Sequence, residues 1–386
     1  MPYSKKALAL HKKLKGKIEI KSRVKLNSKE DLAIAYTPGV GAVSLAIAKN
    51  RNQSWELTNR GNMVAIVSDG TAVLGLGNIG PRAAMPVMEG KSAIFKEFAN
   101  IDAIPLCIDT IETEEIIKFC KYIEPSFGGI NLEDISAPRC FEILEHLEKE
   151  LRIAVFHDDQ DGTAIVTLAA LINACKVLKR EIKNQKIIIN GAGAAGIAIA
   201  RLLLVTGIKD IILVDSMGAI YKGREYLNIY KEKIAVKTNK KKIHGNLEKV
   251  IVDRDVFIGV SKGGILEGKM VKTMNPKPII FAMANPHPEI LPHEAIAAGA
   301  GIVGTGRSDY ENQINNALVF PGIFRGLLDS WSRKITTKMK ISVAEAIAKS
   351  VTKPTIHNIL PKISDKKVVN KIANCFVKAK KKQYYN

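Results

Sequence analysis

Short apolar runs separated by amphipathic stretches recur along most of the chain. Runs rich in Val, Ile, Leu and Phe predict buried strands, and they lie at Met63–Val67, Ala103–Ile108, Gly129–Leu132, Arg152–Phe156, Ile187–Ile189, Ile211–Asp215, Val256–Val260, Ile279–Ala282 and Gly301–Val303. Between them, apolar residues spaced three and four apart predict helices, among them Thr113–Ile123 and Thr163–Leu178. Strands that alternate with helices predict α/β domains with parallel sheets.

The two ends of the chain follow other patterns. A basic helix and then a short strand, Lys17–Ile20, are expected at the start. Tyr36–Val40 is predicted to turn, because proline fixes φ and glycine permits a reversal, and the helix Ala42–Lys49 follows. The tail from Ser342 is predicted to be helical and polar.

One glycine-rich loop has the setting of a dinucleotide site. It consists of Gly191, Ala192, Gly193, Ala194, Ala195 and Gly196. A strand enters it, a helix leaves it, and Asp215 ends the next strand. Glycines let the backbone approach a pyrophosphate at the helix N-terminus, and the acid accepts the ribose hydroxyls. We predict a Rossmann-type NAD site; a tight turn without a ligand is the alternative.

The same glycine spacing occurs at Gly75, Gly77 and Gly80. Pro86 and Gly90 interrupt the helix that follows, and no acid ends the next strand at a suitable distance. We therefore interpret this second loop as a backbone turn in another domain rather than as a nucleotide site.

Two acidic pairs, Glu133–Asp134 and Asp158–Asp159, each follow a predicted strand. Open α/β sheets bind ligands at the carboxyl ends of their strands. Glu133, Asp134 and Asp159 would supply three hard oxygen ligands, which suit Mg²⁺ or Mn²⁺ better than zinc. The alternative is that these acids are ordinary loop and cap residues.

Two further side chains have two interpretations each. Lys91 lies on a predicted helix face with apolar neighbours, where it is either a lysine that reaches solvent or a base beside a cation. Tyr36 precedes Thr37-Pro38-Gly39 and is either a packing residue or a proton donor.

Composition excludes several classes of protein. The net charge is +20, but only 13 of the 58 basic residues are arginine and aromatics make up 6%. Base recognition relies on arginine with interleaved aromatics, so we expect no nucleic-acid partner. The five cysteines contain no Cys-x-x-Cys, which indicates a reducing cytoplasm. No uninterrupted apolar stretch reaches the roughly 18 residues of a membrane span, and we expect no membrane partner.

Several blocks of sequence, taken together, resemble malic enzyme of the short bacterial type. The resemblance runs in order from about residue 32 to about residue 330, and its blocks are Ala35–Val40, Ser68–Pro81, Val87–Lys91, Asn131–Asp134, Phe156–Asp159, Gly306–Tyr310 and Asn315–Gly322. It implies an N-terminal α/β catalytic (malic) domain, residues 1–157. Residues 158–386 would form the Rossmann-type NAD(P)-binding domain and the C-terminal helices.

The resemblance implies oxidative decarboxylation of L-malate to pyruvate and CO₂, with Mg²⁺ or Mn²⁺ and NAD or NADP, in a homodimer or higher homo-oligomer. By matching motifs, Glu133, Asp134 and Asp159 correspond to metal ligands, Lys91 to the general base and Tyr36 to the general acid. Three further roles are implied: Asp158 orients the lysine, Asn285 lies near nicotinamide and substrate, and Asn315 and Asn316 hold malate.

Two positions leave questions about cofactor and metal. Asp215 favours NAD, because its charge would repel a 2′-phosphate, although Lys222 and Arg224 lie just beyond it and could neutralise one. Asp161 stands where relatives of the short type usually carry an uncharged residue or histidine, and an extra acid there could alter metal affinity.

Two other functions remain open from the sequence. A metal-independent dehydrogenase of the amino-acid type also has two domains and a catalytic lysine, but it would not need three carboxylates at strand ends. A nucleotide-binding protein without catalysis would not need the set formed by Tyr36, Lys91 and the acids.

Overall fold

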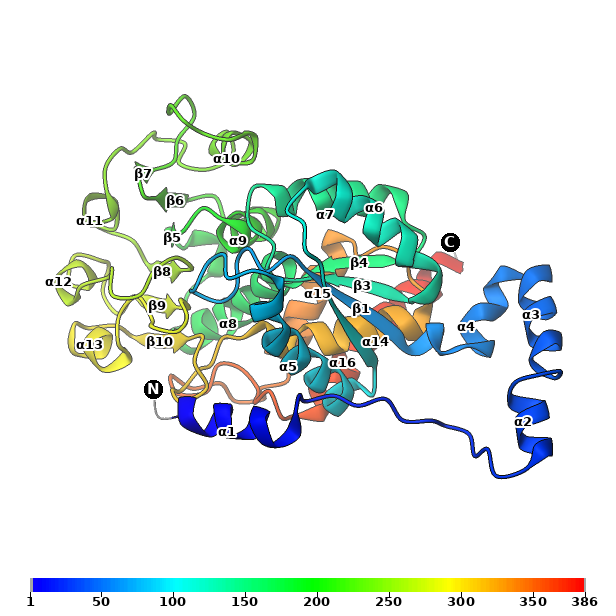
Figure 1. Ribbon diagram of the computed structural model, residues 1–386. Coiled ribbons are helices and arrows are strands. Elements are labelled where there is room, and N and C mark those ends of the chain that lie inside the picture. Colours follow the sequence, from blue (N-terminus) through cyan, green and yellow to red (C-terminus); the bar gives the residue numbers. More distant parts are fainter. Residues whose placement is uncertain (1–2, 385–386) are drawn as a thin grey trace.

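The computed structural model describes residues 3–384, with side chains as far as Val377. Its strands form two sheets that lie side by side (Figure 1). The first has the order β2-β1-β3-β4 and is parallel throughout; its strands are β1 (Met63–Ser68), β2 (Asp102–Cys107), β3 (Gly129–Leu132) and β4 (Ala154–His157). The four strands predicted between Met63 and Phe156 are all present.

The second sheet has the order β10-β9-β8-β5-β6-β7. Its strands are β5 (Ile187–Asn190), β6 (Ile211–Asp215), β7 (Gly218–Ala219), β8 (Val256–Gly259), β9 (Ile279–Ala282) and β10 (Ile302–Thr305). All pairs are parallel except β6 with β7, a two-residue strand that the sequence did not predict. The strand order reverses between β5 and β8, as it does in a Rossmann domain. The predicted α/β class is confirmed.

Helices cover both sheets and connect them. The longer ones are α5 (Pro81–Ala99), α6 (Thr113–Ile123), α7 (Arg139–Glu150), α8 (Thr163–Val177), α9 (Ala194–Val205), α14 (Phe320–Ser330), α15 (Thr337–Ala348) and α16 (Lys366–Tyr384). Shorter ones are α4 (Ser54–Leu57), α10 (Ile229–Ala235), α11 (Leu247–Val250), α12 (Gly268–Val271) and α13 (Pro292–Ala297). Most residues of α8 are buried, because this helix crosses the molecule between the two sheets.

The C-terminal helices return to the first sheet. Phe320 and Phe324 of α14 pack against Phe95 of α5, with ring centroids 4.6 Å and 5.4 Å apart, and Phe324 also meets Phe156 of β4. One hydrophobic core therefore runs from the first sheet through α8 and α14 into the second. The core fixes the position of the two strand edges relative to each other.

The N-terminal segment differs from the rest of the described chain. It contains α1 (Ser4–Leu14), α2 (Lys29–Ala35) and α3 (Val40–Lys49), and none of its residues from 3 to 63 is buried. The predicted strand Lys17–Ile20 is wrong: these residues run along α5 without regular structure, and Lys17 contacts Glu89 and Pro86. Figure 1 shows α2 and α3 standing away from both sheets.

The stretch Lys29–Lys49 is long and apolar enough to cross a membrane, judged by length and composition alone. The turn at Tyr36–Gly39 divides it into α2 and α3, and buried core helices and signal sequences pass the same test. The finding is weak, and the absence of a membrane partner stays a prediction.

Candidate active site

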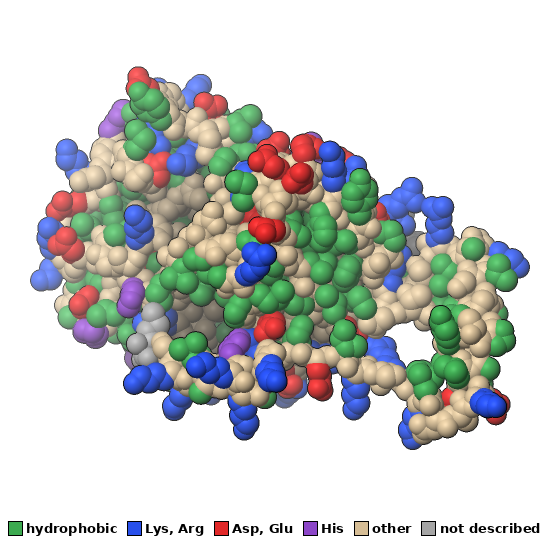
Figure 2. All heavy atoms as spheres, viewed as in Figure 1, with side chains coloured by type: hydrophobic (Ala, Val, Ile, Leu, Met, Phe, Trp, Pro, Cys, Tyr) green, Lys and Arg blue, Asp and Glu red, His purple; other side chains and the backbone are tan. Residues whose placement is uncertain are grey.

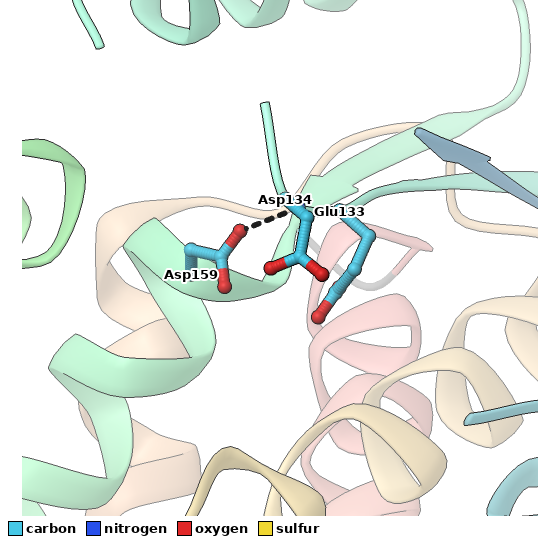
Figure 3. A group of neighbouring side chains, drawn as sticks. All are labelled: Glu133, Asp134 and Asp159. Carbon is cyan, nitrogen blue, oxygen red and sulfur yellow. Dashed lines mark hydrogen bonds between the residues drawn. The ribbon is translucent and has the colours of Figure 1, made fainter. Parts of the chain in front are cut away.

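The four acids meet because their strands are neighbours. β3 and β4 are paired in parallel, with Leu132 opposite His157, so the residues that follow each strand lie at the same edge of the sheet. Carboxylate oxygens of Glu133, Asp134 and Asp159 all lie within 4.8 Å of one another, and the three side chains converge (Figure 3). The sequence predicted that these three side chains lie close together.

Local backbone features direct these carboxylates. Asp134 has a φ of 52°, in the left-handed region that non-glycine residues seldom adopt. Its carbonyl accepts a hydrogen bond from the Ala72 amide at 2.9 Å, and its own amide donates to Asp159 Oδ2 at 2.9 Å. After β4 the chain makes a wide turn at Asp158–Gly162. A Cβ on Gly162 would lie 1.9 Å from Asp158 Oδ1, so a side chain there would displace the Asp158 carboxylate.

Lys91 reaches the acids from α5, which faces this edge. Its ammonium lies 2.5 Å from Glu133 Oε1 and also pairs with Asp158, and only 7% of the residue is exposed. Burial lowers the pKa of Lys91, but the charges of Asp158 and Glu133 outweigh it and hold the pKa above its ordinary value. The alternative of a lysine that reaches solvent is wrong, because this ammonium is enclosed.

The three carboxylates fit a hard divalent cation. Burial raises the pKa of Glu133 and of Asp159. Burial and then repulsion from Asp159 and Glu133 raise the pKa of Asp134, whose buried Oδ2 has no hydrogen-bond partner. A cluster that resists ionisation and leaves an oxygen unsatisfied matches the oxygen-rich sites of Mg²⁺ and Mn²⁺.

A cavity of about 440 Å³ opens beside these groups. Lys91, Glu133, Asp134 and Asp159 line one side, and the predicted substrate residues Asn285, Asn315 and Asn316 line it as well. The side chain of Asn315 accepts a hydrogen bond from the Ala317 amide at 2.8 Å, which fixes the direction of its amide group. The structure therefore brings these predicted residues into one cavity; Asp158 lies beneath it, fully buried against Lys91.

The glycine loop lies in a neighbouring groove of about 620 Å³. Gly191 has a φ of 117°, and a Cβ on Gly196 would lie 1.8 Å from the Gly191 carbonyl, so α9 can approach β5 only with glycine at this position. Val260 and Ser261 line both the groove and the acidic cavity. A dinucleotide in the groove would therefore have one end at the acids.

Asp215 lines the same groove, but both of its oxygens already have partners. Arg224 donates to them at 2.8 Å and 2.6 Å, and Lys231 donates to one at 2.7 Å. Although burial raises the pKa of Asp215, these two partners outweigh it and hold the pKa far below its ordinary value. The sequence anticipated that Arg224 could neutralise charge here and missed Lys231, which follows Asp215 by 16 residues.

Tyr36 is the predicted site residue that the structure leaves apart. It ends α2 in the projecting segment, is 64% exposed, and does not line the acidic cavity of its own chain. Its role stays a prediction.

Sequence reasoning missed one supporting acid, Glu289. Glu289 is fully buried and accepts hydrogen bonds from the Ala284 amide at 3.0 Å and the Ser261 amide at 3.2 Å, so it joins two loops that line the cavity. Its place shortly after Asn285 was the available signal. Asp161, which the sequence marked as an extra acid near the metal, pairs instead with Lys340 of α15 at 2.6 Å and does not line the cavity.

Comparison with known proteins gives one consistent result. Residues 15–148 match the family described as malic enzyme, N-terminal domain, and residues 160–380 match malic enzyme, NAD binding domain. The chain is 52% identical to a bifunctional malic/malolactic enzyme of Bacillus subtilis, over 98% of this chain and 93% of that one. It is also 52% identical to an NAD-dependent malic enzyme of Geobacillus stearothermophilus, over 94% and 76%.

A solved structure agrees with the fold. The crystal structure of an NAD-dependent malic enzyme from Thermotoga maritima matches with a TM-score of 0.93 and 49% identity, covering 96% of this chain and 98% of that one. With both family regions matched and half of all positions identical to curated relatives, the chain belongs to the malic enzyme family.

Proposed function

We propose that this protein oxidises and decarboxylates L-malate, with NAD as the preferred electron acceptor and Mg²⁺ or Mn²⁺ at Glu133, Asp134 and Asp159. The observation that carries the proposal is the acidic cavity with its enclosed lysine, which shares Val260 and Ser261 with the dinucleotide groove. The names of the relatives support the same substrate and cofactor.

The reaction converts malate and NAD⁺ into pyruvate, CO₂ and NADH. A divalent cation at the carboxylates would offset the charges that raise the pKa of Lys91 and so favour its neutral amine. The neutral amine of Lys91 takes the proton of the C2 hydroxyl while C2 loses a hydride to the nicotinamide. The C3–C4 bond then breaks and CO₂ leaves. The electron pair of that bond stays on the three-carbon fragment and forms the enolate of pyruvate. A proton from Tyr36 at C3 completes the product.

The chain's other residues hold the reactants. Asp158 keeps the Lys91 ammonium in place from below, and Asn315 and Asn316 present amide groups to a malate carboxylate. A divalent cation at the three carboxylates would supply the positive charge that stabilises developing negative charge on substrate oxygen.

Three other features belong to the proposal. The domain boundary lies at residues 157 and 158, the protein is a homodimer or higher homo-oligomer, and it works in the cytoplasm without nucleic-acid or membrane partners.

The deciding experiment follows NADH formation at 340 nm with L-malate and Mn²⁺. We expect turnover that stops when the metal is chelated and returns when Mn²⁺ is added back. Turnover that survives thorough chelation would favour the metal-independent dehydrogenase. If the protein binds NAD but forms no NADH, the result would favour a non-catalytic nucleotide-binding protein.

A further inference from the structure

The turn that carries Asp134 has a backbone conformation that its own sequence does not favour. The φ of Asp134 is 52°, and a non-glycine residue stays in this region only where the surrounding structure determines it. The amide of Asp134 donates to Asp159, but that partner is another carboxylate of the same cluster. The carbonyl of Asp134 accepts from the amide of Ala72, in the loop after β1. This loop is therefore the place to look for what holds the turn.

Thr71, the residue before Ala72, contacts the same turn. Its Oγ1 accepts a hydrogen bond from the amide of Ser136 at 2.9 Å. The Ala72 amide and the Thr71 hydroxyl thus bind the backbone on either side of Ile135, whose side chain is buried. Two contacts from one short segment fix the course of the turn between β3 and α7.

The Thr71 hydroxyl is itself held in one orientation. It donates to Asp69 Oδ1 at 2.7 Å, and it accepts from Arg139 Nη2 at 3.0 Å as well as from the Ser136 amide. A hydroxyl has one donor and two acceptor positions, so every position is used. Thr71 is 9% exposed, and a buried polar group that loses its partner is costly. The hydroxyl therefore has little freedom to turn away from Ser136.

An ion pair anchors the hydroxyl to the elements on either side. The Asp69 side chain is fully buried and lies 2.9 Å from Arg139, the first residue of α7. Most lysine and arginine side chains on the face shown in Figure 2 project into solvent, whereas that of Arg139 is only 23% exposed. Its Nη1 donates to the carbonyl of Ile111 at 2.6 Å. Asp69 and Arg139 therefore link the loop after β1 to the start of the helix that follows the turn.

These contacts end at the metal ligands and not at the cavity surface. Thr71 does not line the acidic cavity, although Ala72 does. The hydroxyl can therefore act on the site only through the backbone that carries Glu133 and Asp134. Figure 3 shows the carboxylates of both residues directed toward Asp159. If the turn relaxed, repulsion among the three carboxylates would separate them.

We propose that Thr71 is a positioning residue for the metal ligands on the neighbouring turn. Its hydroxyl, oriented by Asp69 and Arg139, holds the turn so that its two carboxylates converge on Asp159 before a cation binds. The inference rests on the proposed function, because that function places Mg²⁺ or Mn²⁺ at these carboxylates. Groups that orient metal ligands strengthen metal binding, since the cation then does not have to assemble its own site.

Thr71→Val tests the proposal because it removes the hydroxyl and changes no charge. The Kd for Mn²⁺, measured from the paramagnetic resonance signal of the free ion, should rise about tenfold. Thr71→Ser keeps a hydroxyl and should return the Kd close to the wild-type value. The matched control is Thr238→Val in the second domain, which removes a buried hydroxyl that donates to the Ile234 carbonyl at 2.9 Å. This control should bind Mn²⁺ as the wild type does.

Kinetics separate positioning from a general loss of structure. Saturating Mn²⁺ should assemble the ligands even without the hydroxyl, so kcat of Thr71→Val should stay within about threefold of wild type. The KM for Mn²⁺ should rise by about the same factor as the Kd, roughly tenfold. A lower melting temperature with unchanged Kd and KM for Mn²⁺ would show that Thr71 only stabilises the fold, and the proposal would be overturned.

Hydrogen exchange measures the turn in the metal-free protein. Without its acceptor, the Ser136 amide should exchange faster in Thr71→Val, within the peptide that covers residues 133–139, and remain protected in Thr238→Val. If Thr71→Val does not fold, Thr71→Ala removes the same hydroxyl but leaves room for water, and the same changes are expected. An unchanged Kd for Mn²⁺ in a folded Thr71 variant would overturn this inference alone. Wild-type protein without affinity for Mn²⁺ would overturn the proposed function together with it.

Discussion

The carboxyl ends of β3 and β4 carry four acids, which Lys91 of α5 faces, whereas the corresponding ends of β5 and β8 carry glycine loops and little charge. At the first edge the acids repel one another, burial opposes their ionisation, and Asp134 adopts an unfavourable backbone conformation. At the second edge, Gly196 lets a helix approach a strand and Asp215 is fully paired. The same architecture is strained at one edge and relaxed at the other.

The difference follows from what each edge is expected to bind. A divalent cation needs concentrated negative charge, which the protein must hold together against repulsion before the cation arrives. A pyrophosphate needs backbone amides at a helix start, which close packing provides without strain. Substitutions at the first edge should therefore reduce activity more than stability, and substitutions at the second should reduce both.

The largest effect is expected at Lys91. Lys91→Ala removes the base that accepts the hydroxyl proton, so kcat should fall roughly a hundredfold or more. NAD binding, followed by fluorescence titration, should be nearly unchanged because Lys91 does not line the dinucleotide groove. The control is Lys96→Ala on the same helix, where the lysine is half exposed and pairs with Asp102. Wild-type kcat in Lys91→Ala would place the base elsewhere.

The next effect concerns Gly196. A Cβ there would lie 1.8 Å from the Gly191 carbonyl, so Gly196→Ala should lower the free energy of unfolding by about 1–3 kcal/mol. The KM for NAD should also rise by about tenfold, since α9 is displaced from the pyrophosphate. In Gly193→Ala no atom lies within 4 Å of the new Cβ, so the melting temperature should be retained. Equal melting temperatures for both variants would contradict this account of the loop.

A smaller effect is expected at Lys231. Its ammonium lies 2.7 Å from Asp215 in the groove, and its removal would leave Asp215 with less positive charge nearby to offset a 2′-phosphate. Lys231→Ala should lower kcat/KM for NADP about fivefold relative to NAD, which corresponds to roughly 1 kcal/mol. Lys233→Ala, an exposed lysine on the same helix, should leave the ratio unchanged. A rise in the kcat/KM for NADP relative to NAD in Lys231→Ala would contradict this role of Lys231.

The smallest effect is a change in pH dependence at Glu289. Burial raises its pKa to about 7, so ionisation costs the folded state more than the unfolded one. Protonated Glu289 therefore adds to the free energy of unfolding below the ordinary carboxyl pKa, and this contribution is lost as pH rises through about 7. Glu289→Gln should flatten the decline between pH 5 and pH 8 in chemical denaturation. Glu294→Gln, at an exposed position, serves as control, and parallel profiles would reject the assignment.

The sequence predicted both edges because each depends on local patterns. An acid that follows a strand must lie at the carboxyl edge of a parallel sheet, so the sequence alone predicts that Glu133 and Asp159 lie close together. Gly191 to Gly196 is similarly defined by the strand and helix that flank it.

Contacts between distant segments were beyond the sequence. Nothing near Asp215 indicates that Lys231 completes its pairing, and nothing near Asp161 points to Lys340. The position of Tyr36 is harder still to predict, because the helices on either side of it have no buried residue. A pattern of apolar residues indicates that a helix face will be covered, but it does not identify the cover.

The two loops with G-x-G-x-x-G spacing also bear on how such motifs are used. At Gly75, where nucleotide binding was not expected, a Cβ would lie 1.9 Å from the carbonyl of Asn285, a residue of the other domain. This glycine is needed because a peptide group, rather than a phosphate, comes into contact with the backbone. The glycine spacing therefore indicates only that some other group lies very close to the loop backbone. A genome-wide search by the motif alone would count both loops as nucleotide sites. A nucleotide site can be assigned from this motif only when the group in contact with the loop is also known.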